Sequence, residues 1–178
     1  MLPVQHCQPG GLAIGPNENL LIGCTETFDS AGHDWSAKDA NSAAPASVIM
    51  DLQSGKVLTN VAGVTGNDEV WLNAGDQRYY VAARNNPGDP VLGVIDARQR
   101  TLVQLVPTLN TPAKVSTDTG WPGQPSCLMF PAGTAHSVAA DPQNNHVFVA
   151  ESVNNVQPNC LNGCIGVFGT PQGDNTGT

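Results

Sequence analysis

Short runs of apolar residues alternate with turn-forming residues along most of the chain, and three of these segments align with one another. Residues 11–24, 69–83 and 137–151 each contain a short apolar strand, a turn rich in Gly, Pro, Asn or Asp, and a second strand with β-branched or aromatic residues. Two strands separated by such a turn are typical of a β-hairpin. The sequence therefore predicts three copies of one hairpin, and an internal repeat of this kind determines the fold.

A second type of hairpin follows the first two copies. Residues 47–52 and 57–61 flank one turn, and residues 91–97 and 101–106 flank another. After the third copy only the first strand of this hairpin is recognisable, at residues 164–168. Four strands per unit, repeated at about 60–70 residues, are typical of the blades of a β-propeller. We therefore predict an all-β fold made of four-stranded antiparallel sheets that form an incomplete β-propeller.

The domain organisation follows from the repeat. Residues 1–178 are predicted to form a single partial propeller, with blade 1 at about 11–63, blade 2 at about 69–108 and blade 3 at about 136–169, followed by a polar tail at 170–178. Propellers usually have four to eight blades. We therefore expect either a chain truncated from a longer propeller or a homodimer in which two chains complete a six-bladed ring.

Positions within the blades carry more detailed expectations. The first strand of each blade, such as residues 12–14, is expected to be buried on both faces because it would lie near the central channel. Trp71 of the second copy is accordingly expected in the core. Asp51 and Asp96 end the third strands of their blades, where an Asp side chain can accept hydrogen bonds from the backbone of the following turn.

Cysteine usage points to a redox environment. The five cysteines have neither a CxxC spacing nor the spacing of a zinc site. Cys7 and Cys24 lie at the ends of the first hairpin, so antiparallel pairing predicts a disulfide between them. Cys160 and Cys164 are expected to close a short loop, with Cys127–Cys160 or Cys127–Cys164 as alternatives. Disulfides indicate an extracytoplasmic protein, periplasmic or secreted, whose signal peptide is absent from this chain. Five reduced cysteines in a cytosolic protein are the alternative.

Composition and charge exclude several classes of function. Hydrophobic residues make up 40% of the 178 residues, which is enough for one packed domain. A net charge of −8 and seven basic residues without a cluster argue against nucleic acid and anionic membranes as partners. No apolar stretch approaches the roughly 20 residues of a membrane-spanning helix. The GxSxG, P-loop, Rossmann and HExxH motifs are absent.

The blade motifs resemble those of a known group of proteins. Residues 11–16 and 137–142, together with the third-strand ends at 48–51 and 94–96, resemble the YVTN/NHL-type β-propellers, including the lactonase-like and gluconolactonase-like (SMP-30-like) branches. The resemblance covers nearly all of residues 8–168. It implies a six- or seven-bladed propeller that binds ligands or metals at the loops entering the first strands. Gluconolactonase-like propellers hold a divalent metal there with Glu, Asn and Asp side chains.

Alignment of the three copies identifies candidate functional residues at these loops. The catalytic candidates are Asp68, Glu69 and His136, and Asp68 and Glu69 are also the candidate ligands of a divalent metal, Ca²⁺ or Zn²⁺. Asn67 and His6 are the candidate ligand-binding residues at these loops. Arg84, which ends the second strand of blade 2, is a further candidate because its guanidinium could bind a carboxylate or phosphate. Each has a structural alternative: Asp68 could cap the loop, Glu69 could be solvated, His136 could bond a neighbouring blade, and Arg84 could pair with a nearby acid.

Two classes of function fit these candidates. The first is a propeller-type binding domain that presents its loop face to a small molecule or a protein. The alternative is a metal-dependent hydrolase or lactonase of the gluconolactonase-like type, in which the metal activates water and a carboxylate acts as general base. The sequence favours the binding domain because no complete set of metal ligands is present, and it leaves open whether the protein is an enzyme.

Overall fold

The computed structural model describes eleven strands in three antiparallel sheets, and its one helical segment is the three-residue 3₁₀ turn η1 (Pro16–Glu18). Cys127 and the predicted polar tail lie outside the described residues. Among the residues described, no helix is long and apolar enough to cross a membrane. The described residues are 2–33, 44–87, 90–108, 135–151, 160 and 163–169.

Each sheet is a meander in which consecutive strands are neighbours. The first sheet contains β1 (Cys7–Ile14), β2 (Asn19–Thr27), β3 (Ala46–Asp51) and β4 (Val57–Ala62). The second contains β5 (Glu69–Asn73), β6 (Arg78–Ala83), β7 (Val91–Asp96) and β8 (Thr101–Pro107). The third contains β9 (Ala135–Ala140), β10 (Val147–Glu151) and β11 (Cys164–Phe168). The predicted all-β class and the blade-like sheets of a partial β-propeller are confirmed.

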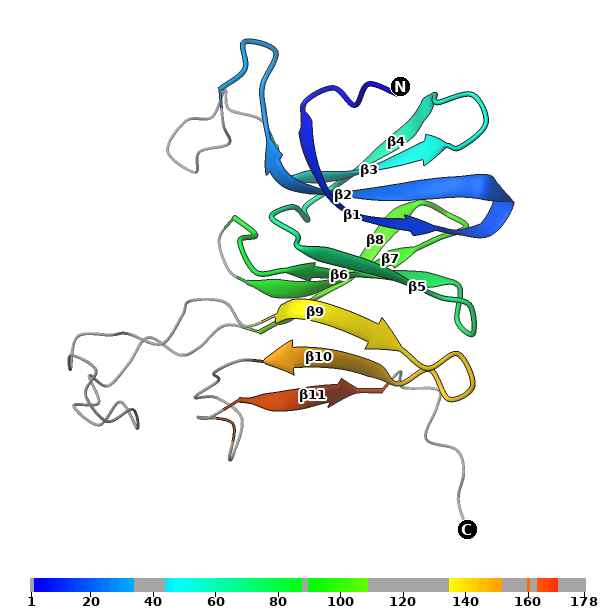
Figure 1. Cartoon of the computed structure of the whole chain (residues 1–178), viewed down its shortest axis with the longest axis vertical. Helices are drawn as coiled ribbons and strands as arrows, with labels where there is room; N and C mark the ends of the chain where they lie inside the picture. Colours follow the sequence, from blue (N-terminus) through cyan, green and yellow to red (C-terminus); the bar gives the residue numbers. More distant parts are fainter. Residues whose placement is uncertain are drawn as a thin grey trace, which may run out of the picture.

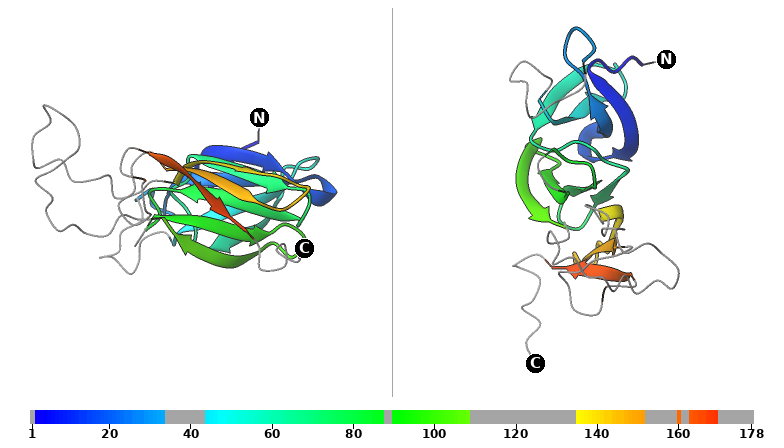
Figure 2. Two further views of the ribbon diagram at one scale, coloured as in Figure 1. Left: turned by 90° about the horizontal axis from the view of Figure 1, so that it is seen from below. Right: turned by 90° about the vertical axis from the view of Figure 1, so that its left-hand side faces the viewer.

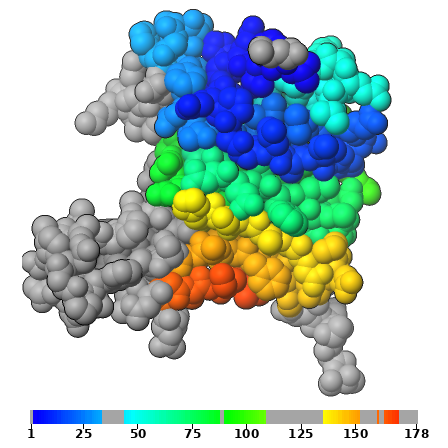
Figure 3. All heavy atoms as spheres, in the orientation of Figure 1, coloured from blue at the N-terminus to red at the C-terminus, as the bar shows by residue number. Residues whose placement is uncertain are grey.

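The three sheets are stacked face to face in the order of the sequence, as the bands of colour in Figures 1 and 3 show. Their first strands lie closest together, with β1 against β5 and β5 against β9, whereas the outer strands β4 and β8 hardly touch. The sheets therefore fan out from their first strands, as seen from the side in Figure 2. This fan is the arrangement of blades around a propeller axis.

The second sheet packs through both of its faces. Strand β6 is almost entirely apolar, and successive residues of a strand point to opposite faces. Tyr79 and Val81 therefore pack against the first sheet, where they contact a cluster that includes Leu21 and Ile49. The opposite face packs against the third sheet. The residues buried there are Tyr80, Ala82, Leu92, Val94, Ala135, Val138, Val147 and Val149.

A glycine allows the first two sheets to approach each other. A Cβ atom at Gly11 would lie 2.6 Å from the side chain of Val70 and 2.7 Å from its backbone nitrogen. Strand β1 is irregular between Gln8 and Leu12, and it starts at Cys7, ahead of the apolar run from which the hairpin was predicted. The hairpin itself has the expected pairing, with Leu12 opposite Ile22.

The prediction that first strands are buried on both faces is wrong. Leu12 and Ile14 are 58% and 59% exposed, because they lie on the face of β1 that points away from the second sheet, while Ala13 packs against that sheet. The prediction that Trp71 is a core residue is also wrong, since it is 41% exposed.

The predicted roles of the turn aspartates are confirmed. The Oδ1 atom of Asp51 accepts hydrogen bonds from the hydroxyl of Ser54 at 2.6 Å and from its N–H at 2.7 Å. These bonds hold the pKa of the Asp51 carboxyl below its usual value. In the second sheet, Oδ1 of Asp96 accepts from the N–H groups of Arg98 at 2.9 Å and Gln99 at 2.7 Å.

The N-terminal residues cover part of the outer face of the first sheet. Val4 packs against the cluster that contains the Cys7–Cys24 disulfide and Met50, and Leu2 lies against Gly55 in the turn between β3 and β4. Residues 2–6 form no strand.

The two tyrosines allow a direct test of the packing of the second sheet. Tyr79 and Tyr80 are 0% and 3% exposed and are the only tyrosines in the sequence. Burial raises the pKa of Tyr79 to about 12. Burial, together with the hydrogen bond to Asp76, also raises the pKa of Tyr80. Both pKa values lie above the ordinary 10.0. The stability contributed by the neutral phenols is therefore complete below pH 10.0 and lost as the pH rises toward 12.

We expect tyrosinate absorbance to rise together with the loss of β-sheet circular dichroism in a single alkaline transition. In Tyr79→Phe, about half of the absorbance change should disappear. Tyrosinate formation near pH 10.0, with the circular dichroism unchanged, would show that these rings are not buried between the sheets.

Candidate functional site

Several of the predicted site residues lie at one edge of the stack. Asp68 and Glu69 stand at the start of β5, Arg84 follows the end of β6, and His136 is near the start of β9. Because β5 and β6 are antiparallel, the start of one strand and the end of the other meet at the same edge. The β5–β9 packing then adds His136 from the third sheet.

Asp68 pairs with two basic side chains from different sheets. Its Oδ2 atom lies 3.5 Å from Nη1 of Arg84 and 3.4 Å from Nε2 of His136. All three side chains are partly exposed, so solvent screens these pairs and they contribute little to stability. We call Asp68, Arg84 and His136 the rim cluster. It places one carboxylate oxygen within 3.5 Å of a guanidinium nitrogen and an imidazole nitrogen on a partly exposed surface.

Glu69 has a different position from the rim cluster. Its Oε2 atom accepts a hydrogen bond from the N–H of Val138 at 3.1 Å, which connects the second sheet to the third. Within the described part of the chain, the possible ligand atoms of Asp68, Glu69 and His136 do not all lie within 4.8 Å of one another. A Ca²⁺ or Zn²⁺ ion at these residues remains a prediction.

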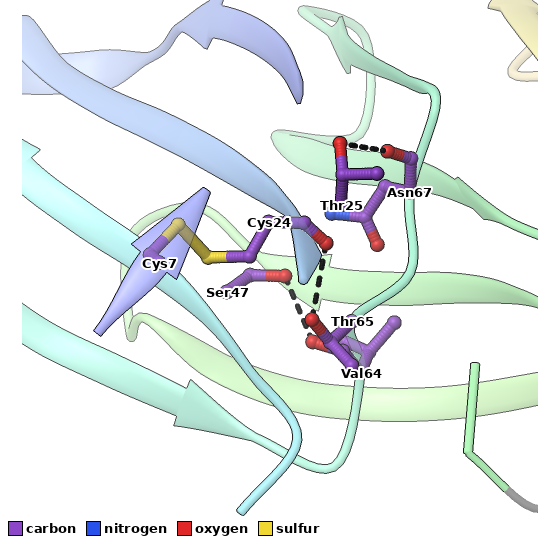
Figure 4. Close-up of a disulfide and its surroundings, with 7 residues drawn as sticks. All are labelled: Cys7, Cys24, Thr25, Ser47, Val64, Thr65 and Asn67. Atoms are coloured by element: carbon purple, nitrogen blue, oxygen red, sulfur yellow. Dashed lines mark hydrogen bonds between the residues drawn. A yellow bond between two sulfur atoms is a disulfide. The ribbon is translucent and has the colours of Figure 1, made fainter. Parts of the chain in front are cut away.

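Asn67 is fully buried between the first and second sheets. With its amide oriented to satisfy both ends, the nitrogen donates to the carbonyl of Thr65 at 3.2 Å and the oxygen accepts from the N–H of Cys24 at 3.0 Å. Figure 4 shows the hydroxyl of Thr25 donating to the carbonyl of Asn67, at 3.4 Å. Asn67, a candidate ligand-binding residue, therefore uses its amide to attach the loop that enters β5 to the first sheet.

The loop around Asn67 has two further connections to the first sheet. The hydroxyl of Thr65 donates to the carbonyl of Cys24 at 3.0 Å, and the hydroxyl of Ser47 donates to the carbonyl of Val64 at 3.0 Å. Figure 4 shows both bonds beside the Cys7–Cys24 disulfide. This disulfide therefore lies where the first sheet holds the loop that positions Asp68.

His6 belongs to a separate group on the first sheet. Its Nδ1 atom lies 3.0 Å from the carbonyl oxygen of Asp29. The Asp29 carboxylate accepts the N–H groups of His33 and Ala31, each at 2.8 Å, and the pKa of Asp29 is lowered mainly by the hydrogen bond from the His33 backbone. His6 also lines a hollow of about 260 Å³ on this sheet. The sequence analysis grouped His6 with the other candidates, but in the structure its side chain contacts a loop of the first sheet and not the rim cluster.

The sequence analysis missed a buried carboxylate at the end of β10. Glu151 is 1% exposed, and its Oε2 atom lies 3.8 Å from the sulfur of Cys160 and 3.8 Å from that of Cys164. The two sulfurs are bonded to each other, and Cys7 is bonded to Cys24, so both predicted disulfides are confirmed. The sequence feature that could have identified it is the acidic residue Glu151 at the end of an apolar strand, at the position where the second copy has Ala83.

A hollow connects this carboxylate with the rim cluster. Its volume is about 610 Å³, and its walls include His136, Glu151, Cys164 and Ile165. His136 therefore contributes to both features. The Glu151, Cys160 and Cys164 group is the one set of three acid, His or Cys side chains in the described residues whose ligand atoms come within 4.8 Å. Because Cys160 and Cys164 form a disulfide, their sulfurs are not thiolate ligands for a metal.

Comparison with known proteins gives no functional assignment. No protein-family model and no curated protein matches the sequence. Among solved structures, the hydrazine synthase of Kuenenia stuttgartiensis is similar with a TM-score of 0.48 and 10% sequence identity, over 93% of this chain and 47% of that one. The chain thus spans about half of that protein. The blade architecture is established by the strand pairing of the chain itself, and membership of the YVTN/NHL-type or gluconolactonase-like groups remains a prediction.

Proposed function

We propose that the chain is a propeller-type binding domain whose rim cluster binds a carboxylate or phosphate group of a small molecule or protein. The observation that carries this proposal is that the Arg84 guanidinium and the His136 imidazole both lie within 3.5 Å of one oxygen of Asp68, at a partly exposed edge. A guanidinium has five N–H donors in a planar fork that fits an anionic group. Asp68 orients the fork, and the ligand accepts from the remaining donors.

The contacts of the acidic residues support binding over hydrolysis. A metal-dependent hydrolase needs carboxylates that are directed at a metal or at a water molecule. Glu69 instead accepts the N–H of Val138, and Asp68 faces Arg84 and His136. A hydrolase or lactonase that uses Asp68, Glu69 and His136 with a divalent metal is the alternative function.

An extracytoplasmic location is also proposed. Two disulfides in a chain of this size are compatible with an oxidising compartment, such as the periplasm or the extracellular space. The Cys7–Cys24 disulfide supports the sheet that fastens the loop entering β5, so the proposed binding site benefits from this oxidised state.

Titration of labelled protein with citrate and with inorganic phosphate tests the binding proposal. We expect either anion to shift the backbone amide resonances of residues 68, 84 and 136 in a saturable way, and Arg84→Gln to weaken the affinity at least tenfold. Arg98→Gln is the matched control, because Arg98 is an exposed arginine in the β7–β8 turn at the opposite edge of the sheet. The ratio of the affinities for citrate and for phosphate distinguishes a carboxylate site from a phosphate site.

Two results would contradict the binding proposal. One is an equal effect of Arg84→Gln and Arg98→Gln. The other is a thermal stabilisation by Ca²⁺ or Zn²⁺ that EDTA reverses and Asp68→Asn abolishes, which would favour the metal-dependent hydrolase.

We also propose that a second copy of the chain packs on the two ends of the stack. The outer face of the third sheet exposes Ile165 and Val167, and the outer face of the first exposes Leu12 and Ile14. Within one chain, apolar faces of this kind already pack on each other, between the first and second sheets and between the second and third. Two chains related by an axis along the propeller channel would repeat this contact twice and complete a ring of six sheets.

Light scattering after size-exclusion chromatography tests this assembly. We expect a mass of about twice the 18.5 kDa of one chain. Ile165→Glu should shift the protein to the monomer, because a buried charge at the contact is costly. Val103→Glu replaces an exposed apolar residue on β8 and should leave the dimer intact. A stable monomer of the unmodified chain would refute the proposed ring.

A further inference from the structure

A buried carboxylate lies against the Cys160–Cys164 disulfide. Glu151 is directly opposite Cys164 in the pairing of β10 with β11, and its Oε2 atom is 3.8 Å from both sulfurs. The neighbouring strand makes room for this acid, since a Cβ atom at Gly166 would lie 3.1 Å from Oε1 of Glu151. The carboxylate is therefore in contact with both sulfurs of this disulfide.

The carboxylate favours the reduced form of the cysteine pair. A disulfide has no proton to donate, whereas each of the two thiols formed by reduction has an S–H donor. Those donors can hydrogen-bond to Oε2 of Glu151, which already lies at 3.8 Å from both sulfurs, within the range of a hydrogen bond to sulfur. Hydrogen bonds present only in the dithiol state stabilise that state relative to the disulfide.

The two disulfides of the chain differ in access. Cys164 is partly exposed and lines the 610 Å³ hollow, while Cys160 is fully buried and is not among its lining residues. A thiol that enters the hollow reaches the sulfur of Cys164 first. Cys7 and Cys24 are instead both buried, in a cluster with apolar neighbours such as Ile22 and Met50.

The disulfides also differ in how strongly they support the fold. Cys7 and Cys24 are 17 residues apart, and their bond joins β1 to β2. Cys160 and Cys164 are only 4 residues apart. A crosslink that closes a longer loop removes more entropy from the unfolded chain and stabilises the fold more. Reduction of Cys160–Cys164 should therefore destabilise the fold less than reduction of Cys7–Cys24.

We propose that Cys160–Cys164 is a redox-active disulfide that exchanges with a dithiol substrate at the hollow, with Glu151 as the proton carrier. A substrate thiol gives its proton to Glu151, and its sulfur bonds to Cys164 as the Cys164–Cys160 bond breaks. The electron pair goes to Cys160, which takes the proton from Glu151. The second substrate thiol then attacks the mixed disulfide and releases Cys164, which takes the second proton. The substrate is oxidised by two electrons and the protein disulfide is reduced by two.

Comparing the reduction of the two disulfides in the same protein tests the proposal without any substitution. The oxidised full-length chain is equilibrated with mixtures of reduced and oxidised dithiothreitol and quenched with acid. Differential alkylation and peptide mass spectrometry then quantify each disulfide. The equilibrium constant for reduction should be at least tenfold larger for Cys160–Cys164 than for Cys7–Cys24, a difference of about 30 mV for a two-electron couple. Equal constants, or a larger constant for Cys7–Cys24, would overturn the proposal.

Substitution of the carboxylate tests the role of Glu151. In Glu151→Gln the preference should fall below threefold, because a neutral amide accepts S–H hydrogen bonds less strongly than a carboxylate. The matched control is Glu26→Gln, since Glu26 is an exposed acid on β2 two residues from Cys24, and it should leave both constants unchanged. If folded Glu151→Gln keeps the wild-type ratio of the two reduction constants, Glu151 has no role in the exchange. If that variant does not fold, Gly166→Ala, which displaces the carboxylate, should give the same reduced preference.

Discussion

The packing of the second sheet between the other two is the interaction on which the rest of the structure depends. Strand β6 presents Tyr79 to the first sheet and Tyr80 to the third, so neither face can be left in water without exposing a large aromatic surface. This packing fixes which strand ends meet. Because β5 lies against both β1 and β9, Asp68 is held near His136 of the third sheet, and the loop before it is fastened to Cys24 of the first.

Local features of the fold were predictable, whereas features that depend on distant neighbours were not. The hairpins, the Asp51 and Asp96 turns and the Cys7–Cys24 pair follow from residues close in sequence or directly paired in one hairpin. The exposure of Leu12 could not be predicted because it depends on which sheets are present next to β1. Aligning the three copies identified Asp68 and His136 of the rim cluster, and Arg84 was a candidate because it follows the second strand of its blade. The alignment could not predict that Glu69 turns toward the backbone of the third sheet, since that depends on side-chain direction.

The rim cluster and the Cys160–Cys164 disulfide occupy neighbouring parts of one surface. His136 pairs with Asp68 and also lines the hollow in front of Cys164. A ligand held by its anionic group at Arg84 would therefore lie beside the hollow that Glu151 and Cys164 line. The two features rest on different observations, an ion-pair arrangement in one case and a carboxylate–disulfide contact in the other. The proposed binding function and the proposed redox function can consequently be confirmed or refuted independently of each other.

Native-state hydrogen exchange tests most directly the claim that the sandwiched second sheet holds the structure together. Strands β6 and β7 each have a neighbour on both sides and another sheet on both faces, so their amides should exchange only through global unfolding. Amides of β11, which has one neighbouring strand and an exposed face, should exchange through smaller openings and at rates well above those of β6. Protection in β11 equal to that in β6, or fast exchange in β6 and β7, would contradict this account.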